Sequence, residues 1–561
     1  MLLPFSFVFI VFLNFCHAGP IIETNYGKVE GFNIPIKNGG AEAYLAIPYA
    51  KPPVGDLRFE KPESPEAFED VYQATQFRND CSPHYRLVAQ FSSYSGEDCL
   101  TLNVIKPKTV TEKLPVLVWI HGGGYAIGSA SLHDFNFFAK RYTTQNMIVV
   151  TIQYRLGFLG FFANDKVSNL GLFDQVAALK YVKENIEHFG GDPDRITIWG
   201  YSAGGGSVSQ LTLSPYSRDL YQHAIIMSGG SFAGWANGAL TKQHSAEFMK
   251  DAGCDSIECL KTKDLHDLYN AQEVSGHNTG TSDILKWSPV IDGDFFPSHP
   301  SKLVDEAPVK PTLIGLSDKE GAYFTVANQG RVLSDFGLSI QDIQNFNEQF
   351  VLDTIKNKYL YNNRLGEHEE YVFETLKNHY LHKNRPEKPE TTFFLDKYTE
   401  IFSDVSFNVP LVREIKKRAE SNNQVYAYLF NHYSDEIWKK HVPKETRGSL
   451  HVNEYHYLFD MAVLGKINFK KDPDQRVRND FIDLVISFAK TGKPEIKGVE
   501  WNPVAKGDDI SYLNIGTEGN TIKTGLFEEA AQLWNDLAKK TNFDVVDPSA
   551  SKVHNSLKNE L

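Results

Sequence analysis

The sequence predicts an α/β fold with a largely parallel central sheet flanked by helices. Short apolar runs rich in valine and isoleucine alternate with helical patterns along the first half of the chain. Continuous runs of this kind are typical of strands that are covered on both faces. Because strands and helices alternate, we expect helical crossovers between parallel strands.

The predicted strands lie at Pro115–Ile120, Met147–Ile152, Ile196–Trp199, Ala224–Met227, Thr312–Gly315 and Val425–Phe430. Between the second and third, apolar residues recur at helical spacing from Leu172 to Phe189. The run Gly190–Pro193 (Gly-Gly-Asp-Pro) is a strong signal for the end of this helix.

The stretch from Val332 to Pro410 is mostly polar and helix-like. We interpret it as helices inserted over the sheet and the active site. A chain of 561 residues would ordinarily suggest several domains. With these insertions, and with no internal repeat or low-complexity linker in the sequence, we expect a single domain spanning residues 19–545.

Residues 1–18 are predicted to be a secretory signal peptide. An apolar run from Leu2 to Phe15 precedes small residues at Cys16 and Ala18, which suit a cleavage site. A buried N-terminal helix or a membrane anchor is the alternative, but the run is too short to span a bilayer comfortably.

Residues 546–561 are predicted to be a polar tail. It ends in Lys558, Asn559, Glu560 and Leu561, which resembles the retention signal of the endoplasmic reticulum with Asn in place of Asp. We therefore expect the protein in the lumen of the endoplasmic reticulum, held by a retention receptor, with secretion as the alternative. The net charge of −13 disfavours nucleic acids and anionic membrane surfaces as partners.

Four cysteines remain after the predicted cleavage, and they are Cys81, Cys99, Cys254 and Cys259. An even number in a secretory context favours two disulfides. Three connectivities are possible, of which the pairing of sequence neighbours is the simplest. Metal binding is the alternative, but the cysteines lack the spacing and the histidine partners of zinc sites.

The run Gly200–Gly204 (Gly-Tyr-Ser-Ala-Gly) points to nucleophilic catalysis by Ser202. It follows a predicted strand and precedes an apolar helix, which is the strand–turn–helix context that such an elbow requires. The start of that helix presents free N–H groups that favour developing negative charge.

A glycine-rich turn at His121–Gly124 directly follows the strand Pro115–Ile120. Glycines let backbone N–H groups approach a tetrahedral oxyanion, and loss of one such donor typically costs about 10²–10³ in rate. We assign the N–H groups of Gly123, Gly124 and Ala203 as the oxyanion hole.

Together these motifs resemble the type-B carboxylesterases, a family that includes the cholinesterases. The resemblance covers almost the whole mature chain and is carried by Ile47–Gly55 (IPYAKPPVG), Glu97–Val104 (EDCLTLNV), Phe189–Pro193 (FGGDP), Gly200–Gly205 (GYSAGG), Met227–Gly229 (MSG) and Pro289–Gly293 (PVIDG). It implies the α/β-hydrolase fold, the ion pairs Arg58–Glu97 and Arg155–Asp174, and the disulfides Cys81–Cys99 and Cys254–Cys259. The second disulfide loop is shorter than expected, which puts its geometry in question.

The resemblance also implies the partners of Ser202. Glu320 in the run Leu313–Gly321 takes the position of the acid, with Asp318 as its local rival. The chain has 18 histidines, so the residues alone cannot choose the base. The run Gly448–Glu454 places it at His451, with His432 and His456 as rivals and with Glu454 and Ser228 as polar support. The family usually has Gly after this histidine, where this chain has Val452.

These residues imply a serine carboxylesterase that hydrolyses uncharged esters through an acyl-enzyme, without a metal or cofactor. The combination of a predicted signal peptide and a retention-like C-terminal tail resembles that of nematode gut esterases. Two alternative functions remain open. One is a catalytically reduced adhesion or binding protein, which the intact triad disfavours. The other is a cholinesterase.

Cholinesterases carry a tryptophan at the position of Ala89 and a glutamate at that of Tyr201, and the tryptophan holds a cationic substrate. Both replacements argue against a choline site here. Phe91 and Tyr94 lie nearby and leave a shifted aromatic contact open.

Overall fold

The computed structural model describes residues 19–551, apart from residues 38, 82–94, 277–278, 328–333 and 508. Within this part of the chain, an 11-stranded sheet forms the centre of the molecule, in the order β14-β13-β12-β11-β10-β9-β7-β8-β6-β4-β3. The strands from β13 to β8 in this order are parallel, and antiparallel strands extend both edges. The predicted fold class is therefore confirmed.

The strands of the central sheet are β3 (Phe32–Ile34), β4 (Ala41–Pro48), β6 (Thr101–Pro107), β7 (Leu114–Ile120), β8 (Ile148–Ile152), β9 (Gly191–Tyr201), β10 (His223–Met227), β11 (Thr312–Ser317), β12 (Val425–Phe430), β13 (Ser511–Gly516) and β14 (Gly519–Thr524). A separate small sheet contains β1 (Ile21–Thr24), β2 (Gly27–Glu30) and β5 (Tyr72–Gln73). Every residue of β7, β8, β11 and β12 is buried, which explains why their sequences are predominantly apolar.

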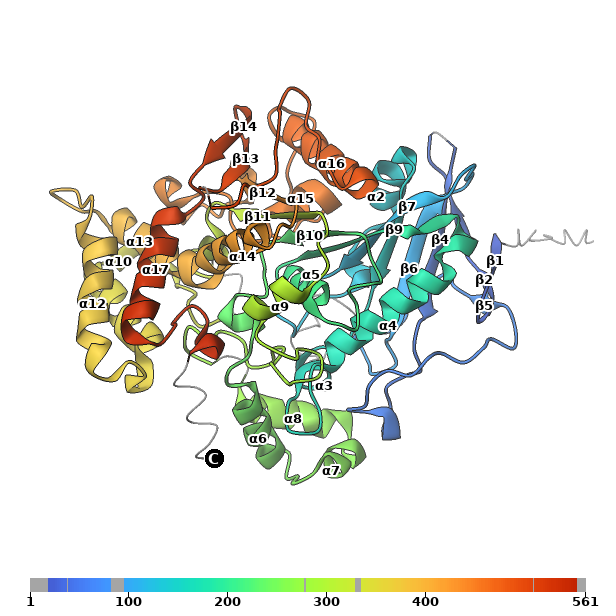
Figure 1. Ribbon diagram of the computed structural model, residues 1–561, viewed down its shortest axis with the longest axis horizontal. Coiled ribbons are helices and arrows are strands. Elements are labelled where there is room, and N and C mark those ends of the chain that lie inside the picture. Colours follow the sequence, from blue (N-terminus) through green and yellow to red (C-terminus); the bar gives the residue numbers. More distant parts are fainter. Residues whose placement is uncertain are drawn as a thin grey trace, which may run out of the picture.

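Helices cover both faces of the sheet (Figure 1). On one side lie α3 (Gly157–Phe161), α4 (Leu170–Asn185), α5 (Ala203–Leu213), α9 (Pro300–Glu306) and α14 (Val409–Glu420). Across the sheet lie α2 (Phe135–Arg141), α15 (Asn453–Phe459) and α16 (Asp474–Thr491). The lower edge in Figure 1 carries α6 (Thr241–Asp251), α7 (Ile257–Thr262) and α8 (Leu265–Ser275).

The predicted insertion between Val332 and Pro410 is indeed helical. It contains α10 (Ile340–Asn345), α11 (Glu348–Thr354), α12 (Glu369–Lys377) and α13 (Thr391–Ser403), which lie with α17 (Glu528–Thr541) at the left of Figure 1. Helix α13 contacts the short helical turn Glu320–Tyr323, so the insertion borders the site.

The run Gly190–Pro193 ends the helical segment, as the sequence predicts, and β9 is longer than the predicted strand Ile196–Trp199 because it already begins at Gly191. Gly190 ends the preceding helical turn with a φ of 84°, and its left-handed backbone turns the chain directly into the strand.

An aromatic cluster anchors α15 to the centre of the sheet. The ring of Phe459, the last residue of α15, lies 4.5 Å from Trp119 of β7 and 5.0 Å from Trp199 of β9, measured between ring centroids. All three side chains are buried. Because α15 begins two residues after His451, this packing also positions the loop that carries His451 relative to the sheet.

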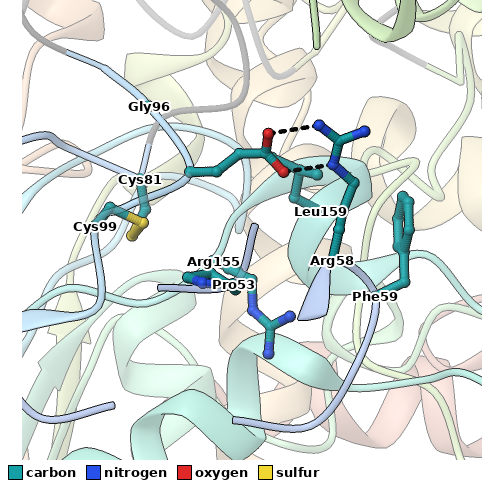
Figure 2. A pocket seen from close by; sticks show the side chains of 9 residues that line it. Pro53, Arg58, Phe59, Cys81, Gly96, Cys99, Arg155 and Leu159 are labelled. Atoms are coloured by element: carbon teal, nitrogen blue, oxygen red, sulfur yellow. Dashed lines mark hydrogen bonds and ion pairs between the residues drawn. A yellow bond between two sulfur atoms is a disulfide. The ribbon is translucent and has the colours of Figure 1, made fainter. Parts of the chain in front are cut away.

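Both implied disulfides are present, with Cα–Cα distances of 5.2 Å for Cys81–Cys99 and 5.5 Å for Cys254–Cys259. The short second loop therefore accommodates its bridge. Figure 2 shows the first disulfide beside Arg58, which forms a two-pronged ion pair with Glu97 at 2.6 and 2.7 Å.

Arg58 also donates hydrogen bonds to the carbonyl oxygens of Leu260, Lys261 and Lys263, just beyond the second disulfide. One guanidinium thus connects Glu97, inside the first disulfide loop, with the segment that follows the second disulfide. Buried Arg155 pairs with Asp174 at 2.7 Å, so the structure forms both implied ion pairs.

The ends of the chain, including the predicted signal peptide and Lys558–Leu561, lie outside the described residues. The domain boundaries stay a prediction, although residues 546–551 of the expected tail pack on the body, where Gly234 N–H bonds the Val546 carbonyl. No helix in the described ranges is long and apolar enough to cross a lipid bilayer.

Candidate active site

Ser202 lies on a sharp turn between β9 and α5, as the sequence predicts. Its backbone has a φ of 57° and a ψ of −125°, a conformation that costs of order 1–3 kcal/mol for a residue other than glycine. Two hydrogen bonds hold the turn: Ser202 N–H donates to the Met227 carbonyl and Gly206 N–H donates to the Ser202 carbonyl, both at 2.8 Å. A Cβ atom at Gly204 would lie 2.1 Å from the Ile120 carbonyl oxygen, so only glycine allows this close approach.

His451 bridges Ser202 and Glu320. Its Nε2 lies 2.9 Å from the Ser202 Oγ, and its Nδ1 lies 2.5 Å from the Glu320 Oε2. Since a carboxylate only accepts, Nδ1 carries the proton and donates it, which leaves Nε2 free to accept the serine proton. The three side chains come from the carboxyl ends of neighbouring parts of the sheet, after β9, β11 and β12.

Two further donors orient the Glu320 carboxylate. The Ser317 N–H and the Ser228 hydroxyl both donate to Oε1, at 2.7 and 2.6 Å. The remaining oxygen is thereby left for His451. Glu320 is completely buried, so its negative charge is fixed in place beside the imidazole.

Glu454 forms a second buried carboxyl group behind Glu320. It accepts a hydrogen bond from the Tyr428 hydroxyl at 2.7 Å and lies 3.1 Å from the Ser228 Oγ. Burial, reinforced by the charge of Glu320, raises the pKa of Glu454 to about 8. Glu454 is therefore protonated at neutral pH and can donate to Ser228, whose own hydrogen points at Glu320.

The rival residues lie elsewhere. Asp318 accepts the Ser449 N–H at 2.7 Å, and burial raises its pKa to about 7; its described contacts do not include His451. His432 lies between Thr517 and Asp474, at 2.9 Å from each. His456 is buried, with its Nδ1 3.2 Å from the carbonyl oxygen of Asn453. None of these hydrogen bonds reaches Ser202.

The glycine turn packs directly against the serine elbow. Gly123 has a φ of 121°, and a Cβ there would lie 2.1 Å from the Ile127 carbonyl oxygen. The Tyr154 hydroxyl donates to the His121 carbonyl at 2.7 Å. Burial lowers the pKa of His121 to about 4, so this side chain brings no charge to the turn. Gly123, Gly124 and Ala203 thus lie on the two segments that flank Ser202.

Aromatic rings surround the His451 imidazole, which the sequence did not reveal. Ring centroids lie at 4.8 Å for Phe407, 5.2 Å for Phe324 and 5.9 Å for Tyr323. Phe324 could have been found from its place just after the acid loop. Phe407 lies on the turn after α13, and no local signal connects it with the site.

Val452, which follows His451, has a left-handed backbone with a φ of 68° and a ψ of 0°. A β-branched residue is rarely found there. Its N–H donates to the Tyr201 hydroxyl at 2.5 Å. The sequence identified both positions but did not indicate that they are in contact.

The positions compared with cholinesterases at Ala89, Phe91 and Tyr94 lie outside the described residues.

Comparison with known proteins shows which family the chain is similar to. A model described as "Carboxylesterase family" matches residues 18–534. The chain is 57% identical to Gut esterase 1 of Caenorhabditis elegans over 562 residues, which covers 99% of each chain. It is also 57% identical to Gut esterase 1 of Caenorhabditis briggsae, over 97% of this chain and 98% of that protein. A cholinesterase of Mus musculus is 32% identical over 92% of this chain and 86% of its own length.

Proposed function

The chain belongs to the carboxylesterase family, and we propose on this premise that it is a serine carboxylesterase that hydrolyses uncharged carboxylic esters. The observation that carries the proposal is the position of His451, whose two ring nitrogens reach Ser202 at 2.9 Å and Glu320 at 2.5 Å. A nucleophile, a base and an orienting carboxylate in hydrogen-bonding contact form the arrangement that activates a serine hydroxyl.

In the first half of the proposed reaction, the Ser202 Oγ attacks the ester carbonyl carbon while His451 Nε2 accepts the hydroxyl proton. The oxyanion of the tetrahedral intermediate is stabilised by the N–H groups of Gly123, Gly124 and Ala203. The carbon–oxygen bond to the alcohol then breaks, and His451 returns its proton to the leaving alkoxide. This leaves an acyl ester on Ser202.

In the second half, His451 removes a proton from water, which attacks the acyl carbon. Collapse of the second tetrahedral intermediate releases the carboxylic acid, and the proton returns to the Ser202 Oγ. Glu320 stays ionised throughout and stabilises the imidazolium that forms twice per turnover.

The surroundings of His451 support an uncharged ester as substrate. Phe407, Phe324 and Tyr323 present ring surfaces to the imidazole. Burial raises the pKa of Tyr201 well above its usual value, so the residue before the nucleophile is neutral where cholinesterases carry a carboxylate. We therefore propose a general carboxylesterase in preference to an enzyme for cationic esters.

The test is hydrolysis of p-nitrophenyl butyrate by the mature chain, with Ser202→Ala and Ser209→Ala compared. Ser209 is a buried serine on α5 whose hydroxyl donates to Glu414 and not to His451, and Ser209→Ala, compared per folded molecule, is the matched control. We expect Ser202→Ala to fall to background and Ser209→Ala to retain turnover. A wild-type protein that neither turns over ester nor labels with an organophosphate would favour the binding-protein alternative.

We also propose that the protein resides in the endoplasmic reticulum. The two disulfides among the described residues are typical of an oxidising compartment, which supports the predicted signal peptide at residues 1–18. Removing Lys558–Leu561 should move the protein from cells into the medium, while Ser556→Ala should not. Equal secretion of the truncated and full-length chains would contradict retention by this tail.

A further inference from the structure

We propose that Tyr201 is a positioning residue for His451, acting through the hydrogen bond between its hydroxyl and the Val452 N–H. This bond keeps the base loop in a left-handed turn that valine does not hold by itself. The inference rests on the proposed function, because it assigns a role in aligning the base with Ser202.

The bond connects the loop that carries Ser202 with the loop that carries His451. Tyr201 is the last residue of β9 and immediately precedes Ser202. Val452 immediately follows His451 and precedes α15. A contact of 2.5 Å between residues 251 positions apart therefore ties the residue before the nucleophile to the residue after the base.

The backbone of Val452 explains why the bond matters. A φ of 68° brings the branched side chain of valine against its own backbone, so this conformation is intrinsically unfavourable. The donated N–H belongs to the peptide unit that links residues 451 and 452. Fixing the direction of this N–H fixes the plane of that peptide, and with it the direction in which the imidazole leaves the chain.

Tyr201 is itself held rigidly enough to serve this purpose. Its side chain is 1% exposed, and its ring meets Tyr455 edge-on at 4.8 Å and lies 5.0 Å from the His451 ring. Burial raises the pKa of the phenol well above its usual value, so the hydroxyl stays neutral and accepts the Val452 N–H at any working pH.

The phenol also interacts with Ser228 and Glu454, and this suggests a second route by which it could affect catalysis. The two routes respond differently to Val452→Gly. Glycine enters the left-handed region without steric cost, so it makes the Val452 bond dispensable while leaving Ser228 and Glu454 unchanged.

The experiment is a double-mutant cycle with Tyr201→Phe, Val452→Gly and the combined variant, assayed on p-nitrophenyl butyrate. We expect Tyr201→Phe to lower kcat about tenfold with KM within about twofold, because small misalignments of a catalytic group are costly. Val452→Gly should stay within about threefold of wild type. In the glycine background, Tyr201→Phe should cost less than about threefold.

Tyr72→Phe is the matched control, since the Tyr72 hydroxyl on β5 of the small sheet donates to the Ala46 carbonyl at 2.7 Å, away from both catalytic loops. It should lower stability comparably and leave kcat unchanged. The rate at which an organophosphate labels Ser202 in the folded fraction provides a second readout if yields differ.

An equal kcat loss from Tyr201→Phe in both backgrounds, or no loss in either, would overturn the inference. Ser202→Ala separates this failure from that of the proposed function. If Ser202→Ala abolishes turnover and the cycle is additive, only the role of Tyr201 is wrong. If Ser202→Ala keeps turnover, the proposed nucleophile is wrong.

Discussion

Two buried glutamates in this protein have nearly the same surroundings, yet they differ in one partner. Glu320 and Glu414 are both completely buried. Each accepts a serine hydroxyl, at 2.6 Å from Ser228 and at 2.5 Å from Ser209. Each also accepts a backbone N–H, at 2.7 Å for Glu320 and 2.8 Å for Glu414.

The two glutamates differ in their third partner. Glu414 faces the permanently charged guanidinium of Arg418 at 2.8 Å, whereas Glu320 faces the imidazole of His451. No lysine or arginine is among the described contacts of Glu320. An arginine neutralises its carboxylate at all times, while a histidine does so only when it takes up a proton. On the proposed function, the same local design thus serves architecture at Glu414 and proton transfer at Glu320.

The largest effect is expected from Glu320→Gln. The amide keeps the shape of the side chain but cannot stabilise the imidazolium or enforce the Nδ1–H tautomer. We expect kcat to fall about 10⁴-fold, with the fold intact by circular dichroism. A loss below about tenfold would show that Glu320 does not orient the base.

Glu414→Gln is the matched change at the structural glutamate. It leaves Arg418 as a buried charge without its partner, so the free energy of unfolding should fall by about 3–5 kcal/mol. Denaturant unfolding of the oxidised protein measures this loss. The kcat per folded molecule should be unchanged, and a large kcat loss would erase the proposed distinction.

Glu454→Gln tests the pKa of about 8 at the carboxyl group behind Glu320. The folded protein holds this proton up to about pH 8, whereas the unfolded chain releases it near the ordinary glutamate pKa of 4.5. Between these values the folded state binds more protons, so this group makes stability fall as pH rises. The free energy of unfolding should lose up to about 1.4 kcal/mol per pH unit more in wild type than in Glu454→Gln, between about pH 5 and 8.

Unfolding curves for both proteins at several pH values supply this difference directly. Parallel stability profiles for wild type and Glu454→Gln would mean that Glu454 is ionised in the folded protein. Its hydrogen bond to Ser228 would then have to run in the opposite direction.

Asp318→Asn should have the smallest effect of the four. The side chain accepts the Ser449 N–H, and an amide oxygen can still do so. We expect kcat to stay within about threefold of wild type. A loss approaching that of Glu320→Gln would reopen the choice of acid, and steady-state kinetics of the two variants side by side decides it.

Local sequence patterns predicted most of the parallel strands. The predicted strand Val425–Phe430 coincides with β12, and Pro115–Ile120 falls one residue short of β7. Strand β14 was missed because it lies at the antiparallel edge, where most of it is exposed and its sequence is polar. Strand β13 was missed although it is mostly buried, because Ser511, Asn514 and Gly516 interrupt its apolar residues. An alternating or polar edge strand carries a weaker signal than a run buried on both faces.

The site could be predicted only in part for a similar reason. Ser202 is marked by a local motif, since its turn needs glycines at fixed spacing. His451 is one of 18 histidines, and only the family resemblance selected it. The bond between Tyr201 and Val452 could not be predicted, because it depends on how two loops 251 residues apart are held together.

The distance in sequence between the serine loop and the histidine loop also determines when, during synthesis, the two proposed catalytic groups can meet. Ser202 and His451 lie 249 residues apart in the sequence. At about 5–20 residues per second, a ribosome takes roughly 10–50 s to extend the chain from one to the other. During that interval the growing chain contains Ser202 but not yet His451. On the proposed function, the chain therefore cannot form an acyl-enzyme during synthesis until His451 has been made and β12 has paired with β11.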